Sequence, residues 1–148
     1  MTLRPAGEED SERVMAWRND PDAVRFSVTG RPVTSEEHRA WFARLRSHGS
    51  RSHLWIAEER GAPVGQVRVD VDGDVGTVSI AVAPDRRGQG LGTAMLRAVS
   101  GQAPGALALT RLVALVRVDN PASLRAFEAA GFHRAGVARD AFLELEWP

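Results

Sequence analysis

The segment from residue 80 to residue 92 combines an apolar strand, a glycine-rich loop and the start of a helix. Glycines alternate with other residues over positions 88–92, so the loop can adopt positive φ angles and its backbone stays uncovered. The unpaired N–H groups and the dipole at a helix N-terminus both favour an anion. Arg86 and Arg87 add positive charge beside the loop. The segment therefore predicts a backbone cradle for a diphosphate.

Two common phosphate-binding patterns do not fit this loop. A P-loop would need Lys followed by Ser or Thr, and the chain contains no lysine. The dinucleotide fingerprint would need its third glycine one position later than Gly92. A helix start that needs glycine only for close packing is the alternative interpretation.

Apolar periodicity and turn signals predict a single domain over residues 1–148. The predicted strands lie at residues 2–5, 54–57, 64–71, 75–82, 112–116, 132–134 and 142–147. Predicted helices begin after the polar residues 8–11, at a short piece over 22–26, at the 34–37 capping box, near residue 91 and at 120–121. Residues 101–105 contain Gly and Pro and are expected to form a loop. This order predicts an α+β fold around one mixed sheet.

Composition excludes several classes of protein. The chain has 19 basic and 19 acidic residues and a formal net charge of +0, so charge gives it no attraction to nucleic acid or to an anionic membrane. The absence of cysteine excludes disulfides, thiolate catalysis and cysteine-based metal sites. No apolar run approaches a signal segment or a membrane span. We therefore expect a cytoplasmic protein without a metal.

A second pattern spans residues 120–132. Asn-Pro opens a helix, as N-cap and first helical residue, and Gly-Phe ends it. These residues are also ordinary helix punctuation, so the pattern alone requires no ligand. It follows the glycine loop after one further helix and one apolar strand, and this spacing makes the two patterns support each other.

Together, the Arg-x-x-Gly-x-Gly sequence at 87–92 and the Asn-to-Gly-Phe helix resemble the GNAT N-acetyltransferases. The predicted order of elements agrees with that family over the whole chain. The resemblance implies a mixed, mostly antiparallel central sheet flanked by helices on both faces. It also implies acetyl-CoA as cosubstrate and a small-molecule amine as partner. A homodimer is an open alternative to a monomer.

The resemblance assigns coenzyme contacts to both patterns. In the family, the strand before the loop pairs through its backbone with the pantetheine arm, and one N–H, here that of Val82, stabilises the developing oxyanion. The loop holds the pyrophosphate, and Asn120 touches the coenzyme near its thiol. The implied coenzyme-binding residues are Ile80, Ala81, Val82, Arg87, Gly88, Gln89, Gly90, Leu91, Gly92, Thr93, Asn120 and Phe127.

Two positions depart from the catalytic pattern of the family. Phe127 stands where these enzymes have a tyrosine that protonates the leaving thiolate, and the chain contains no tyrosine. Leu115 stands where the ribosomal-protein alanine N-acetyltransferases have a glutamate base. A thiol with a pKa near 8.5 is a tolerable leaving group, so Ser123 or an ordered water could supply the proton.

His38 is the first candidate for the base that takes the proton of the amine, because an imidazole titrates near neutral pH. Its spacing from Trp41 and Leu45 places it beside the apolar face of its helix, so packing at the edge of the core is the alternative. A relay through water also stays open. The weaker candidates are Glu36, Glu37, Asp70 and Asp74.

The N-terminal part carries a less specific resemblance. The sequences WRNDP at 17–21, VR at 24–25 and EHRAWF at 37–42 resemble acetyltransferases that act on nucleotide-linked amino sugars, as in pseudaminic acid synthesis. This resemblance implies that Arg25, His38 and Trp41 line the acceptor pocket. Arg25 would pair with a phosphate or carboxylate. Trp41 as an anchor of the core is equally open.

Three functions fit these residues. The first is acetyl transfer from acetyl-CoA to a small amine, an amino sugar included. The second is acetylation of a protein N-terminus. The third is a non-catalytic acyl-CoA-binding module, which Phe127 and Leu115 suggest.

Overall fold

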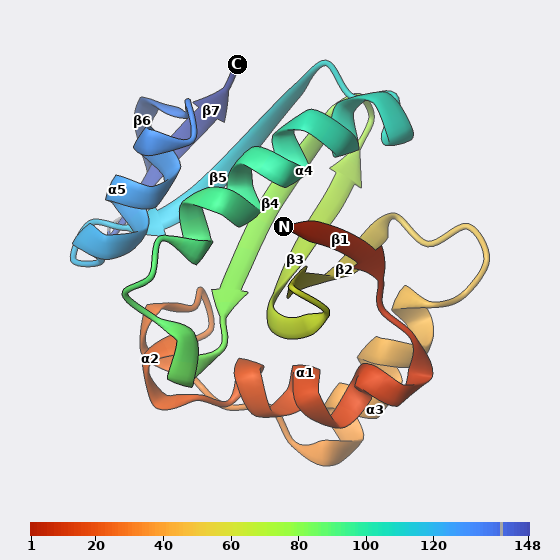
Figure 1. Cartoon of the computed structure of the whole chain (residues 1–148). Coiled ribbons are helices and arrows are strands. Elements are labelled where there is room, and N and C mark those ends of the chain that lie inside the picture. The colour runs from red at the N-terminus through yellow and green to blue at the C-terminus, as the bar shows by residue number, and fades with distance from the viewer. Residues whose placement is uncertain (140) are drawn as a thin grey trace.

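The structure, a computed structural model, describes residues 1–139 and 141–148. Within these residues, seven strands form one sheet in the order β1-β2-β3-β4-β5-β7-β6 (Figure 1). The strands are β1 (Thr2–Pro5), β2 (Ser52–Glu59), β3 (Ala62–Asp72), β4 (Val75–Val82), β5 (Arg111–Arg117), β6 (His133–Arg139) and β7 (Phe142–Trp147). The helices are α1 (Ser11–Arg18), α2 (Pro21–Phe26), α3 (Ser35–Leu45), α4 (Leu91–Leu107) and α5 (Pro121–Ala129), with 3-10 turns η1 (Glu8–Asp10) and η2 (Pro84–Arg86).

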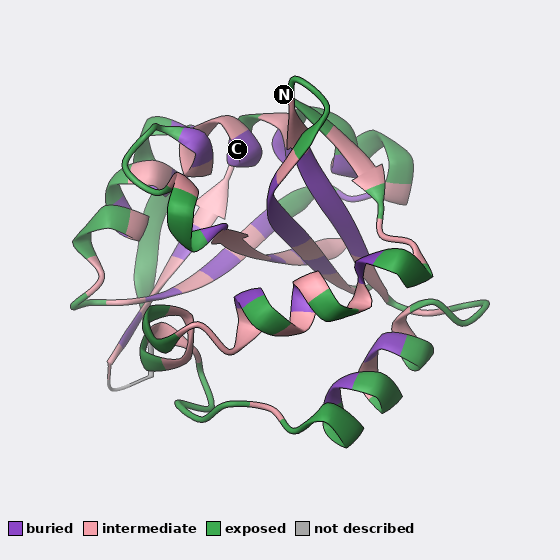
Figure 2. Cartoon of the chain, turned by 60° about the horizontal axis from the view of Figure 1, so that its bottom comes forward, coloured by how far each residue is buried: buried purple, intermediate pink, exposed green. Residues whose placement is uncertain are grey.

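Helices cover both faces of a mixed sheet. Neighbouring strands run antiparallel except β4 and β5, which are parallel. Helices α4 and α5 lie on one face, and α1 and α3 lie on the other (Figures 1 and 2). This arrangement confirms the predicted α+β fold and its mostly antiparallel sheet. Of the helices described, none is long and apolar enough to cross a membrane.

Strand β2 shows how the two helix layers are held. Trp55 and Ala57 belong to the larger apolar cluster, which α4 and α5 cover. The alternate residues Leu54 and Ile56 belong to a smaller cluster under α1 and α3, to which Trp17 contributes. Successive side chains of a strand point to opposite faces, so β2 is apolar on both sides because both sides are covered.

Residues 101–105 do not form the predicted loop, because α4 continues through them to Leu107. Pro104 lacks the N–H that would bond to the Ser100 carbonyl, which normally breaks or kinks a helix. Burial outweighs this loss: Ala103 is fully buried, and Leu107 packs against the larger cluster. The loop prediction was wrong because it gave weight to local helix breakers and none to the apolar face that continues along α4.

Strands β4 and β5 part along their length. Residues 75–77 of β4 pair with residues 111–113 of β5. Beyond this point β4 stays paired with β3 as far as Val82, whereas β5 stays paired with β7 as far as Arg117. The strands therefore diverge toward their C-terminal ends, where they leave what we call the strand gap (Figure 1). Residues 79–82 of β4, beside the gap, are only partly buried.

Asp10 ties β1 to the start of α1. Its carboxylate is fully buried and accepts hydrogen bonds from the Arg4 guanidinium at 2.7 and 3.0 Å and from Arg13 at 2.6 Å. The Gly7 N–H donates a further bond at 2.8 Å. The hydrogen bonds from Arg4 lower the pKa of Asp10, although burial alone would raise it. The network fixes the N-terminus of α1 relative to the sheet.

Asp10→Asn should lower the free energy of unfolding by about 2 kcal/mol at neutral pH, because charge-assisted hydrogen bonds are lost. Since the folded chain lowers the pKa of Asp10, its contribution is present above the unfolded pKa near 3.9 and is lost as pH falls through the folded pKa. Urea unfolding at neutral and at acid pH measures both effects. The exposed Glu8→Gln control should stay within about 0.5 kcal/mol of the parent chain. Equal stability of Asp10→Asn and parent would contradict this account.

Candidate active site

The backbone of β4 presents donors to the strand gap. Ala83 donates its N–H to the Val64 carbonyl at 2.8 Å. Because hydrogen bonding alternates along an antiparallel pair, Ala81 also bonds to β3. The N–H groups of Ile80 and Val82 therefore point away from β3 and toward the gap. Of the three predicted strand contacts, Ile80 and Val82 have an N–H without an acceptor among the described residues, and Ala81 does not.

The glycine loop ends in free N–H groups. Gly88 and Gly90 adopt φ angles of 76° and 75°, in the left-handed region that other residues reach only with strain. The turn at Gly90 lets α4 begin directly after the loop, and the Ala94 N–H donates to the Gly90 carbonyl at 3.2 Å. Residues 90–93 donate their N–H groups to no acceptor in the part of the chain that the structure describes. This is an anion site of the helix N-terminus type.

Gly92 lies where the glycine loop comes close to β4 and α5. A Cβ atom placed on it would lie 3.6 Å from Ala126 of α5, 3.6 Å from Ile80 of β4 and 3.8 Å from Val82. The N-terminus of α4 is thus close to both β4 and α5 at this residue. A long ligand with a diphosphate at one end fits this arrangement, since the free N–H groups and the gap lie on either side of Gly92.

Three other predicted loop residues have different surroundings. Leu91 is buried in the larger apolar cluster, so its side chain anchors the start of α4. Thr93 is partly buried, and Gln89 is exposed. The Gln89 Oε1 accepts a hydrogen bond from Arg86 at 3.3 Å. Leu91 and Thr93 each have a backbone N–H without an acceptor among the described residues.

Arg87 joins the loop to α2. Its guanidinium donates to the carboxylates of Asp20 at 2.6 Å and Asp22 at 3.3 Å. Asp20 also caps α2 by accepting the N–H groups of Asp22 and Ala23. The hydrogen bond from Arg87 is the main cause of a lowered pKa of Asp20. An anion on the loop would compete with these carboxylates for Arg87.

Asn120 and Ser123 lie in the first turn of α5, and Phe127 lies on its buried face. The Asn120 Oδ1 accepts the Ser123 N–H at 3.3 Å, and both residues are partly buried. Phe127 is 2% exposed and packs edge-to-face on Phe132, with ring centroids 5.0 Å apart. The Phe127 ring is therefore part of the core.

His38 is buried between α1 and α3 with both ring nitrogens occupied. Nε2 lies 2.9 Å from the Ser11 carbonyl, and Nδ1 lies 3.0 Å from the Arg18 guanidinium. A carbonyl only accepts and a guanidinium only donates, so these partners assign a neutral ring with its proton on Nε2. Burial lowers the pKa of His38, and the charge of Arg18 lowers it further. The geometry is that of a residue that positions Arg18.

Arg25 and Trp41, the other predicted acceptor contacts, differ in burial. Arg25 is exposed on α2, with its guanidinium 4.7 Å from the Phe26 ring. The pKa of Asp119 is lowered chiefly by Arg117 and to a lesser extent by Arg25, so Arg25 lies near the turn that follows β5. Trp41 is partly buried, and the Arg18 guanidinium lies 4.0 Å from its ring centroid.

Three polar residues near this site were not predicted from the sequence: Arg18, Gln66 and Arg68. Gln66 and Arg68 alternate with the apolar residues of β3 and face α1 and α3. Gln66 is 9% exposed, and Arg68 is partly buried. The alternation of polar and apolar residues along β3 was the sequence signal that could have identified Gln66 and Arg68, because polar residues on a covered face of a sheet need a partner or a function.

The comparison with protein families decides what this arrangement belongs to. Residues 1–133 match the model of the acetyltransferase (GNAT) domain. The chain belongs to the GNAT acetyltransferases. This confirms the prediction of an acetyl-CoA-dependent acetyltransferase.

Solved structures share the fold over nearly the whole chain. An aminoglycoside acetyltransferase in complex with coenzyme A and kanamycin is 20% identical, with a TM-score of 0.84 over 99% of this chain and 93% of that one. Spermidine N-acetyltransferase from Vibrio cholerae, in complex with CoA and spermine, is 16% identical, with a TM-score of 0.86 over 99% and 94%. A chain provisionally named a phosphinothricin N-acetyltransferase is 28% identical, with a TM-score of 0.79 over 98% and 96%. The comparison with curated proteins gives no match.

Gly90→Asp should weaken coenzyme A binding about tenfold relative to Gly90→Asn, because the carboxylate repels the diphosphate at the same place. Asn and Asp tolerate the left-handed region similarly, so backbone strain cancels between the two variants. Calorimetry with coenzyme A measures both affinities, and the difference should shrink in high salt. Equal affinities of the two variants would remove the loop from the coenzyme site.

Proposed function

We propose that this GNAT acetyltransferase moves the acetyl group of acetyl-CoA to a primary amine of a small molecule by direct attack. The observation that carries the proposal is that the free N–H groups at residues 90–93 lie close to β4 at Gly92, and that donors of β4 face the strand gap. It supports a coenzyme with its diphosphate on the loop and its thioester beside Val82. Solved relatives in complex with coenzyme A and kanamycin or spermine support an amine as acceptor.

Each residue of the proposed coenzyme site has one role. Bound acetyl-CoA supplies the acetyl group and the leaving thiol. The Val82 N–H stabilises negative charge on the carbonyl oxygen during the attack, and the Ile80 N–H binds the pantetheine arm. Arg87 and the free N–H groups of residues 90–93 bind the diphosphate. Asn120 contacts the coenzyme near the thiol.

Neither Phe127 nor His38 carries a proton transfer in this proposal. Phe127 has no acidic proton and is buried in the core. Ser123, or a water beside it, protonates the leaving thiolate, which needs little help at a thiol pKa near 8.5. The amine loses its proton to water, because both nitrogens of His38 already have hydrogen-bond partners.

Among small amines, the finer proposal is a nucleotide-linked amino sugar. It is supported by Arg25, whose exposed guanidinium lies near the turn after β5 and suits a phosphate oxygen. Acetylation of a protein N-terminus has less support, because Leu115 carries no carboxylate where that class has its base.

His38→Gln should leave the midpoint of the acid limb of kcat/KM against pH unchanged, because a neutral imidazole with both nitrogens bonded is not the base. Steady-state kinetics over about pH 5.5 to 9 measure this midpoint. A displaced midpoint or a lost acid limb would instead assign the base to His38.

The proposed function predicts release of free thiol when the chain is mixed with acetyl-CoA and a small amine. The panel contains kanamycin, spermine, a nucleotide-linked amino sugar and a peptide with a free N-terminus. Thiol release, with the acetylated product seen by mass spectrometry, should occur with at least one small amine and should fall in Gly90→Asp. Release with the peptide alone would favour the protein-modifying alternative. Coenzyme binding without release for any amine would favour the non-catalytic module.

A further inference from the structure

Two arginines lie near one indole on the face of the sheet that α1 and α3 cover. The Arg18 guanidinium lies 4.0 Å from the ring centroid of Trp41, and the Arg68 guanidinium lies 5.9 Å from it. Arg68 donates to Asp70 at 3.1 Å and to the Ser79 Oγ at 3.4 Å. We call Arg18, Trp41 and Arg68 the arginine pair site.

Arg18 has no carboxylate partner within ion-pair distance among residues 1–139 and 141–148. Its hydrogen bond goes to the neutral ring of His38 at 3.0 Å. Burial lowers the pKa of Arg18, and repulsion from Arg68 lowers it further. A partly buried cation that faces a second cation costs stability, and a bound anion would remove that cost.

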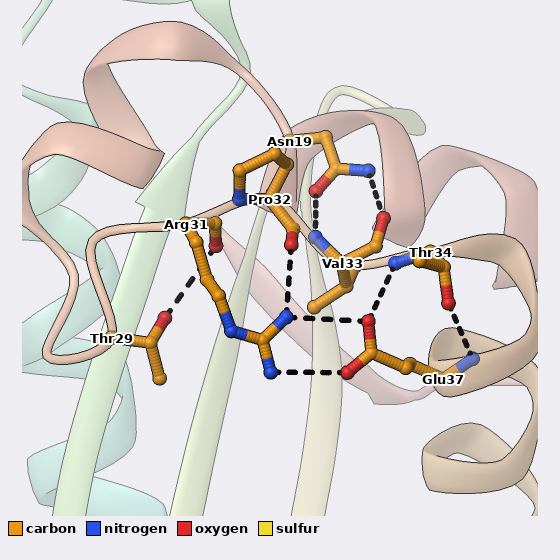
Figure 3. A network of polar contacts seen from close by, with 7 residues as sticks. All are labelled: Asn19, Thr29, Arg31, Pro32, Val33, Thr34 and Glu37. Atoms are coloured by element: carbon orange, nitrogen blue, oxygen red, sulfur yellow. Dashed lines mark hydrogen bonds and ion pairs between the residues drawn. The ribbon is translucent and has the colours of Figure 1, made fainter.

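Two carboxylates on this side of the sheet, Glu37 and Asp70, are already engaged. The Glu37 Oε2 accepts from Arg31 at 3.1 Å, and its Oε1 accepts the Thr34 N–H at 3.0 Å (Figure 3). Asp70 is shared between Arg68 and the Ser52 Oγ, which donates at 2.6 Å. Glu37 therefore acts on Arg18 only from a distance, and one positive charge at the arginine pair site stays without a direct partner.

A second, independent observation concerns Gln66, two residues before Arg68 on β3. Gln66 is 9% exposed, and its Oε1 accepts no hydrogen bond from any described residue. Residues i and i+2 of a strand share a face and lie roughly 7 Å apart, so Gln66 neighbours Arg68 under the same helices. Gln66 pairs with Ala81 in the sheet, next to Val82, whose N–H faces the strand gap. An unpaired amide oxygen thus lies between the arginine pair site and the proposed position of the thioester.

We propose that the acceptor carries an anionic group, a carboxylate or a phosphate, which binds at the arginine pair site while the Gln66 Oε1 accepts a hydrogen bond from its amine. The inference rests on the proposed acetyl transfer and specifies its substrate class. A short chain then joins the amine to the anion of such an acceptor, because Gln66 and Arg68 are only two residues apart on β3, with roughly 7 Å between their Cα atoms. The attacking amine is then held beside Val82, and the anion supplies the partner that Arg18 lacks.

The test compares acceptors that differ only in the anion. One pair is 5-aminopentanoate with its amide, and the other is 4-aminobutyl phosphate with 4-aminobutanol. The anionic member of at least one pair should have a kcat/KM at least about tenfold higher, as expected for a charge-assisted hydrogen bond, and the pair that responds tells carboxylate from phosphate. Equal kcat/KM values within both pairs would overturn the inference while leaving acetyl transfer intact.

Variants test whether the preference for an anionic acceptor comes from the residues on this face of the sheet. Arg68→Gln and Arg18→Gln should lower kcat/KM for the anionic acceptor about tenfold or more and leave the neutral member within about twofold. Gln66→Leu should lower kcat/KM for both members without loss of stability, because it removes an unpaired buried oxygen. The exposed Arg39→Gln on α3 is the matched control and should change neither value. An anionic preference that survives in both arginine variants would place the anion elsewhere.

Thermal unfolding and calorimetry separate a failure of the arginine pair site from misfolding of a variant and from failure of the proposed function. Thermal unfolding shows which variants fold. If Arg18→Gln does not fold, Arg68→Gln alone tests the arginine pair site. If no amine releases thiol, the proposed function fails, and calorimetry with each acceptor pair in the presence of coenzyme A then tests the arginine pair site by itself. Tighter binding of the anionic member, lost in Arg68→Gln, would uphold the site. Equal binding would overturn it.

Discussion

The parting of β4 from β5 is the constraint on which the site depends. Their pairing ends at Thr77 and Val113, and different partners then hold the two strands. The bond from Ala83 to Val64 keeps β4 on β3, whereas β7 keeps β5 in the sheet. A continuous sheet would use the outward N–H groups of β4 in ladder bonds. Because the strands part, those donors face a space in which water or a ligand must supply the acceptors.

The loop and β4 could be predicted because their signals are local. The positive φ angles at Gly88 and Gly90 and the start of α4 at Leu91 follow from residues a few positions apart, and β4 has the predicted bounds. The separation of β4 from β5 could not be predicted in this way, because it does not follow from residues close together in the sequence. It depends on where the pairing of β5 with β4 stops, while β5 stays paired on its other edge with β7, which comes almost thirty residues after Val113. Apolar periodicity carries no information on that choice.

His38 shows why side-chain roles were harder to predict than elements. Its position three residues before Trp41 fits a catalytic imidazole and a packed one equally well. The difference lies in Ser11 and Arg18, which are 27 and 20 residues away in the sequence and occupy both ring nitrogens. Phe127 is a similar case, because only its contact with Phe132 in the folded chain shows that the ring fills the core.

Backbone donors without an acceptor and a cation without a carboxylate partner lie at two ends of one proposed reaction path. Free N–H groups stand at residues 90–93, and Arg18 and Gln66 lie under the opposite helix layer, with β4 between them. Apolar clusters on both faces of the sheet stabilise the fold enough to carry these unfavourable groups. With one covered face, such a sheet could still hold a coenzyme, but its acceptor would lie in water, where charges are screened. The layer formed by α1 and α3 can therefore set the chemistry of the acceptor without any change in the loop.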